Sequence, residues 1–151
     1  MKFFINGTRR GIGKTFVERW GTTDTLEECD IFINNKHDKY QQVDLLFKAA
    51  KLKKRIINIS SMSIYLPKVY PYAVEKMALE HANFQLFSEG IDTTIVRFGV
   101  IDTERSRFIK NVNKISKESA ADILQWLIDQ PHRIMDISVH HDFVQSVLAN
   151  K

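Results

Sequence analysis

Hydrophobic positions along the chain alternate between short, nearly continuous runs and longer segments with helical spacing. The short runs predict five buried β-strands, over Phe3–Ile5, Ile31–Ile33, Arg55–Ile59, Thr93–Phe98 and Ile134–Val139. The longer segments predict four helices, over Lys14–Trp20, Tyr40–Leu52, Tyr72–Phe87 and from a Ser116 cap to Ile128. Short strands that alternate with such helices are typical of βαβ units. We therefore predict an α/β fold: one domain over residues 1–151, with a doubly wound parallel sheet of about five strands and helices on both faces.

Composition narrows the class of protein further. Of the 151 residues, 44% are hydrophobic and 26% are charged, which is the balance of a globular domain with a core and excludes a disordered tail. The net charge of +4 predicts a mild attraction to phosphate groups but is too small to indicate nucleic acid. No apolar run approaches the ~20 residues that span a bilayer, so we expect a cytoplasmic protein with no membrane partner.

A glycine-rich loop follows the first predicted strand and leads directly into the first helix. It contains Gly7, Gly11 and Gly13, whereas an ordinary strand-to-helix turn needs only one glycine. Glycines let the backbone approach a ligand closely, and the N–H groups at a helix start favour a phosphate. Arg9 and Arg10 add two cations beside this loop, although solvated surface charge is an equally plain interpretation of them. The loop therefore predicts a phosphate site.

Tyr72 and Lys76 form the second candidate chemical feature. They lie four residues apart in a predicted helix and hence on the same face, where an ammonium group can favour the phenolate and lower the pKa of the tyrosine. Such a tyrosine could act as a general acid and base, although the pair also occurs by chance on many helices. Ser60 and Ser61 end the third predicted strand, where a serine hydroxyl can project toward a ligand or simply form a turn.

Metal and disulfide chemistry are not expected. Cys29 is the single cysteine, so an internal disulfide and a cysteine-rich zinc site are excluded. His140 and His141 are neighbours on an extended segment and point to opposite faces, so they cannot both bind one ion. We interpret the basic run Lys51–Arg55 as a solvated helix end, with nucleic-acid binding as a distant alternative.

Taken together, these features resemble the short-chain dehydrogenase/reductase family. Five segments are similar to its motifs and occur in the same order along the chain: Asn6–Gly13, Asn34–Asn35, Asn58–Ser61, Tyr72–Lys76 and Arg97–Thr103. The resemblance covers nearly the whole chain and implies a Rossmann-like fold. It also implies an enzyme, an NAD(P)-dependent oxidoreductase.

The resemblance assigns a role to each matching residue. Tyr72 would be the general acid/base, Lys76 would lower its pKa and hold the nicotinamide ribose, and Ser61, preferred to Ser60, would bind the substrate oxygen. The residues that would contact the cofactor, besides Tyr72 and Lys76, are Gly7, Arg9, Arg10, Gly11, Ile12, Gly13, Asn34, Gly99, Ile101 and Thr103. Arg10 stands where a basic residue of this family often binds the 2′-phosphate, which favours NADP(H), with NAD(H) as the other possibility.

The chain also departs from the family pattern. The interval from Gly13 to Asn34 is too short for a further strand and helix, so two family strands are missing and the adenosine half of the cofactor pocket is open or filled differently. Lys36 and His37 replace small residues, and Gln42 is the nearest counterpart of the family's helix asparagine. We expect the lost strands to leave the apolar edge Phe3–Ile5 uncovered. An uncovered edge favours a homo-oligomer, a dimer or tetramer, which the long helices would build.

Two hypotheses about function follow. The first is an NADP(H)-dependent oxidoreductase that transfers hydride between nicotinamide and a small carbonyl or alcohol substrate through Ser61, Tyr72 and Lys76. The second is a non-catalytic binding or structural protein that keeps the fold and has lost tight cofactor binding.

Overall fold

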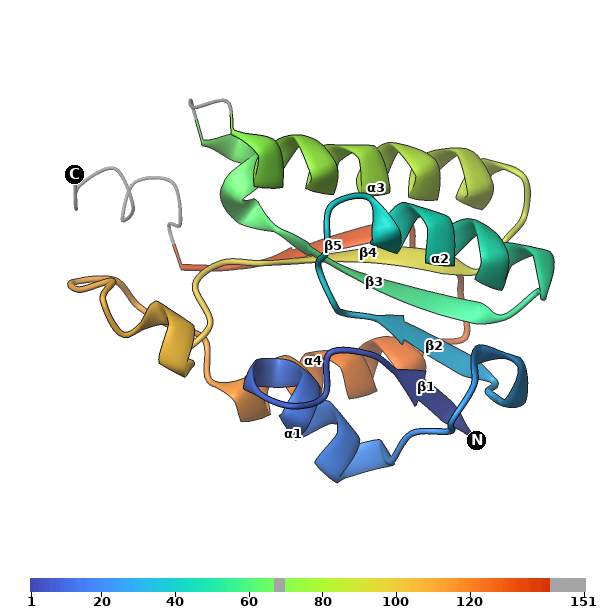
Figure 1. The fold of residues 1–151 in the computed structure, drawn as a ribbon, viewed down its shortest axis with the longest axis horizontal. Helices are drawn as coiled ribbons and strands as arrows, with labels where there is room; N and C mark the ends of the chain where they lie inside the picture. Colours follow the sequence, from blue (N-terminus) through green and yellow to red (C-terminus); the bar gives the residue numbers. More distant parts are fainter. Residues whose placement is uncertain (67–69, 142–151) are drawn as a thin grey trace.

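A computed structural model of the chain describes residues 1–66 and 70–141 (Figure 1). The five strands are β1 (Phe3–Ile5), β2 (Ile31–Asn34), β3 (Arg55–Ser61), β4 (Thr93–Phe98) and β5 (Asp136–Val139). The four α-helices are α1 (Gly11–Trp20), α2 (Gln41–Lys51), α3 (Pro71–Ser88) and α4 (Lys117–Ile128). Three short 3₁₀ helices complete the description: η1 (Leu26–Glu28), η2 (Met62–Tyr65) and η3 (Glu104–Ser106). Each predicted strand and helix is confirmed, with shifts of a few residues at some ends.

The strands form one parallel sheet in the order β1-β2-β3-β4-β5, with helices on both faces. Figure 1 shows α1 and α4 below the sheet and α2 and α3 above it. Alternate strand residues supply the two cores: Ile57 and Ile59 pack toward α1 and α4, whereas Ile56 packs toward α2 and α3. The predicted α/β fold is therefore confirmed.

The crossovers between strands do not all have the same hand. Because the strands follow one another in chain order, every crossover steps in the same direction across the sheet. Crossovers of one hand would then place all helices on one face, yet α1 and α4 lie opposite α2 and α3. Two of the four crossovers thus depart from the right-handed rule that almost all parallel strand pairs obey.

The outer edge of β1 is covered, so the expectation of an exposed apolar edge at Phe3–Ile5 was wrong. Gly21, with a φ of 72°, turns the chain back after α1. The Thr23 amide then donates to the Phe3 carbonyl at 2.7 Å, and the Ile5 amide donates to Thr22 Oγ1 at 2.9 Å. The loop after α1 therefore supplies the hydrogen bonds that another strand would have made, and Phe3 and Ile5 are buried.

Two element ends matter for the site. α1 begins at Gly11, three residues before the predicted start, so the glycine loop itself forms the first turn of the helix. β3 continues to Ser61 and carries both serines to the end of the sheet. Across residues 1–66 and 70–141, no helix is long and apolar enough to cross a membrane.

Candidate functional site

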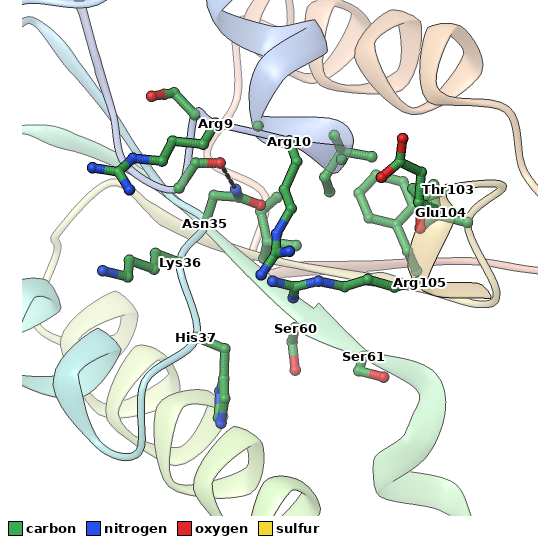
Figure 2. Close-up of a pocket in the computed structure, with 18 of the residues that line it drawn as sticks. Arg9, Arg10, Asn35, Lys36, His37, Ser60, Ser61, Thr103, Glu104 and Arg105 are labelled. Carbon is green, nitrogen blue, oxygen red and sulfur yellow. Dashed lines mark hydrogen bonds between the residues drawn. The ribbon is translucent and has the colours of Figure 1, made fainter. Parts of the chain in front are cut away.

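A cavity of about 830 Å³ lies at the carboxyl ends of the strands (Figure 2). This is the edge of an open α/β sheet at which ligands bind. Its lining brings together all but one of the residues singled out from the sequence: Gly7, Arg9, Arg10, Gly11, Ile12, Gly13, Ser61, Tyr72, Lys76, Gly99, Ile101 and Thr103. Segments up to about a hundred residues apart thus meet at one place.

The glycine loop has a shape that other residues could not adopt. Gly7 and Gly11 have φ values of 68° and 64°, in the left-handed region that favours glycine. A Cβ on Gly13 would lie 1.8 Å from the Gly7 carbonyl oxygen, so the helix can approach the loop this closely only with glycine there. Within the described chain, no side chain caps the start of α1, and its first turn carries no acid. The N–H groups of this turn can therefore bind an anion.

Asn35 and Asn6 hold the glycine loop against the end of β2. Asn6 Oδ1 accepts hydrogen bonds from the Asn35 amide at 2.8 Å and from the Lys36 amide at 2.9 Å. Asn35 Nδ2 donates back to the carbonyls of Asn6 and Gly7, at 3.2 and 3.3 Å. These bonds fix two walls of the cavity relative to each other. Asn35 was matched to a family motif together with Asn34 but was not assigned this role from the sequence, although its place directly after a strand was a further signal.

Asn34 is the one predicted site residue that does not line the cavity. Its side chain is fully buried on the α2 side of the sheet, because strand alternation points it the same way as Phe32. Asn34 Nδ2 donates to the Gln42 carbonyl and to Asn58 Oδ1, both at 2.9 Å. The side chain is thus engaged in joining β2, β3 and α2.

Lys76 is buried at the floor of the site, with only 2% of its surface exposed. Its Nζ donates to Gln42 Oε1 at 2.8 Å and to the Ile59 carbonyl at 2.9 Å, and lies 5.5 Å from the centre of the Tyr72 ring. Burial lowers the pKa of Lys76 to about 7. Gln42, the nearest counterpart of the family asparagine, therefore contacts the lysine directly.

The expectation that Lys76 lowers the pKa of Tyr72 was wrong. Tyr72 is 36% exposed, yet its partial burial raises its pKa, and the opposing influences, the Ser61 hydroxyl and the positive charge of Arg105, are weaker. The physical reason is that burial also disfavours the charged form of the lysine, so much of it is neutral near pH 7.

The two serines at the end of β3 have different surroundings. Ser60 Oγ donates to Glu80 Oε2 at 2.7 Å, and Glu80 in turn pairs with Arg97. Ser61 Oγ accepts only a local hydrogen bond from the Ser63 amide, at 3.1 Å, besides its interaction with Tyr72. Both line the cavity, but Ser61 is the one beside the phenol, in line with the preference stated from the sequence.

Four further charged or titratable side chains line the cavity and were not assigned to the site from the sequence. Lys36 and His37 follow β2, and Glu104 and Arg105 belong to η3 after β4. The His37 ring lies 4.5 Å from the Tyr72 ring, and its Nε2 lies 3.3 Å from Glu75 Oε1. Each of the four follows the end of a strand, which was the signal that could have found them.

Known proteins resemble the chain in structure and not in sequence. No protein-family model matches the chain, and a search of curated protein sequences found no match. A short-chain dehydrogenase from Burkholderia cenocepacia, solved with NADP, has a TM-score of 0.71 at 16% identity over 99% of this chain and 94% of its own. The 3-alpha-hydroxysteroid dehydrogenase from Pseudomonas sp. B-0831, solved with NADH, has a TM-score of 0.67 at 12% identity over 93% and 94% of the two chains. The chain has the short-chain dehydrogenase/reductase fold.

A third structural neighbour supports the same conclusion about the fold. A putative NAD-dependent epimerase/dehydratase from Bacillus halodurans has a TM-score of 0.60 at 19% identity over 98% of each chain. The Rossmann-like architecture expected from the motifs is therefore confirmed, with β1 as the last strand on its side of the sheet.

The cavity fits one half of a nicotinamide dinucleotide better than the other. The groups that could hold phosphates and a nicotinamide ribose all line it: the glycine loop with the start of α1, Tyr72, Lys76 and Thr103. Among the residues that the structure describes, none from 14 to 34 lines the cavity, so nothing beyond β1 forms a wall for adenosine. No group of three or more metal-binding side chains occurs in the described part of the chain.

Proposed function

We propose that this protein is an NADP(H)-dependent oxidoreductase that transfers hydride between nicotinamide and a small carbonyl or alcohol substrate. The observation that carries the proposal is the meeting of Ser61, Tyr72 and Lys76 with the glycine loop in one cavity. Two structural neighbours, solved with NADP and with NADH, support a nicotinamide cofactor.

Bound nicotinamide would supply or accept the hydride. Tyr72 then donates a proton to the substrate oxygen when a carbonyl is reduced, and accepts it when an alcohol is oxidised. Ser61, beside the phenol, donates a hydrogen bond to the same oxygen and orients it. In its ammonium form, Lys76 has three N–H donors and uses two on Gln42 and Ile59, which leaves one for a ribose hydroxyl.

The raised pKa of Tyr72 suits reduction better than oxidation. A phenol that stays protonated is ready to donate a proton to a carbonyl oxygen, whereas a base must first lose that proton. Arg9 and Arg10 beside the glycine loop favour NADP(H), because a guanidinium binds the extra 2′-phosphate through charge-assisted hydrogen bonds. The substrate is a small molecule, held near Ser61 and Tyr72.

A second candidate is a non-catalytic protein that keeps the fold. The observation in its favour is that Gln42 and Ile59 already engage the Lys76 ammonium, while burial keeps Tyr72 protonated. Titration of the protein with NADPH and NADH, followed by nucleotide fluorescence, separates the two. A Kd below about 1 mM supports the oxidoreductase, and failure of both nucleotides to bind supports the structural protein.

The chemical step is tested with Tyr72→Phe, which removes one hydroxyl. NADPH oxidation with a panel of small aldehydes and ketones should fall about 100-fold or more, while NADPH binding stays nearly unchanged, because positioned acid–base catalysis contributes this much. Tyr65→Phe is the matched control, since Tyr65 is 52% exposed and does not line the cavity. A Tyr72→Phe rate above a tenth of the wild-type rate contradicts the assignment.

A further inference from the structure

The strand order limits how much of a dinucleotide this sheet can hold. Open α/β sheets that bind dinucleotides consist of two mononucleotide-binding halves, and the ligand lies across the point where the strand order reverses. Here the order runs from β1 to β5 without a reversal. The sheet therefore lies wholly on one side of such a reversal point, and β1 is its outer edge.

The place of the second half is closed rather than vacant. The outward backbone groups of Phe3 and Ile5 are hydrogen-bonded to Thr22 and Thr23, so a further strand could pair there only by displacing this loop. The cavity follows the same boundary, because its lining comes from residues 7–13 and then from 35 onward. For a nucleoside placed beyond β1, the described part of the chain provides neither a pocket wall nor a strand end to contact.

Positive charge is concentrated in the part of the cavity that remains. Arg9, Arg10, Lys36 and Arg105 line it, and among the residues that the structure describes Glu104 is the one carboxylate in the lining. Figure 2 shows Arg10, from the start of α1, and Arg105, from η3, pointing toward the same region from two different segments. Two guanidinium groups that converge in this way are suited to a phosphate or pyrophosphate.

We propose that the site recognises its cofactor through the nicotinamide ribose and the phosphates, with little contribution from adenosine. Reduced nicotinamide mononucleotide is then a ligand of similar quality to NADH. NADPH binds more tightly than either because its extra phosphate meets the arginines of the loop. This inference rests on the proposed function, since it concerns which part of a nicotinamide cofactor the chain holds.

Equilibrium titrations with four nucleotides test the inference directly. With the full chain, the Kd of reduced nicotinamide mononucleotide should lie within tenfold of that of NADH, and AMP should not bind detectably at 1 mM, on the order of the weakest measurable affinity. A mononucleotide that binds more than tenfold more weakly than NADH overturns the inference and leaves the oxidoreductase proposal intact. If NADPH, NADH and the mononucleotide all fail to bind, both the inference and the oxidoreductase proposal are wrong.

A pair of variants tests the role assigned to Arg105. Arg105→Gln should weaken the binding of NADH and of the reduced mononucleotide by the same factor, about fivefold or more, because both ligands carry the phosphate next to nicotinamide. Arg107→Gln is the matched control, since Arg107 is an exposed cation of the same segment that does not line the cavity. Unchanged mononucleotide binding in Arg105→Gln contradicts the proposed phosphate contact.

Discussion

At the scale of single residues, burial controls the chemistry of the site more than charge pairing does. A lysine four residues after a tyrosine lies on the same helix face, and in water its ammonium would favour the phenolate. Lys76 is instead almost completely buried, and its pKa falls to about 7. Tyr72 therefore stays protonated near neutral pH, and Lys76 is divided between its charged and neutral forms.

The buried lysine predicts a pH dependence of stability. Its pKa is about 7 in the folded protein and 10.5 in an exposed lysine, so between these values the unfolded chain binds more protons and stability rises with pH. When the pH is raised from 7 to 9, we expect the free energy of unfolding of the wild-type protein to rise by about 2 kcal/mol relative to that of Lys76→Met. Urea unfolding of both proteins at the two pH values measures this difference.

Subtracting the result for Lys76→Met also removes the effect of a second titrating group on stability. Burial raises the pKa of Cys29, which acts on stability in the opposite direction at alkaline pH, but both proteins carry this cysteine. Its contribution therefore cancels in the difference between them. Parallel pH profiles for the wild-type protein and Lys76→Met would show that Lys76 keeps an ordinary pKa.

At the scale of elements, the loop after α1 replaces a missing strand. Thr22 has the central role, because its hydroxyl oxygen accepts the hydrogen bond of the outward Ile5 amide. Thr22→Val keeps the shape of the side chain and removes this acceptor. The free energy of unfolding should fall by about 1 kcal/mol, because a partly buried N–H group loses its partner.

A neighbouring threonine provides the control for this edge. Thr23 holds Phe3 through its backbone, and its hydroxyl makes only an exposed bond to the Thr25 carbonyl at 2.8 Å. Thr23→Val should therefore change stability by less than about 0.5 kcal/mol. Equal effects of the two substitutions in chemical denaturation would mean that the Thr22 hydroxyl does not support β1.

The elements could be predicted from the sequence because each rests on local information. Apolar runs such as Ile31–Ile33 predict strands, and Ser116 marks the start of α4, where its side chain accepts from the Ser119 amide. The covered edge of β1 could not be predicted, because it depends on where Gly21 sends the chain in three dimensions. The sequence spacing of Tyr72 and Lys76 likewise predicts that they share a helix face, but it does not predict how deeply the lysine is buried, because burial depends on the three-dimensional fold.

At the scale of the whole molecule, the case for a homo-oligomer no longer rests on an open sheet edge. It rests on the exposed side of α3, the helix that packs beside α2 over the sheet. Val74, Met77 and Phe84 are 45%, 56% and 53% exposed, and their spacing puts them on one side of α3. Met77 and Phe84 line a pocket together with Ile95 and Met135, on the β4 and β5 side of α3. Large apolar side chains gathered on one surface favour contact with another protein surface.

We therefore expect two copies of the chain to associate through this face. Sedimentation at micromolar concentration should give a mass of at least twice the 17.6 kDa of one chain. Phe84→Glu should convert the protein to monomer, because a carboxylate buried in the contact would lose its hydration. Trp126→Glu, at a 53% exposed aromatic residue on α4 across the sheet, is the control and should leave the mass unchanged. Since α3 also carries Tyr72 and Lys76, the monomeric variant should bind cofactor less tightly. A wild-type protein that sediments as a single 17.6 kDa species would contradict the prediction and would mean that these apolar residues remain exposed to water.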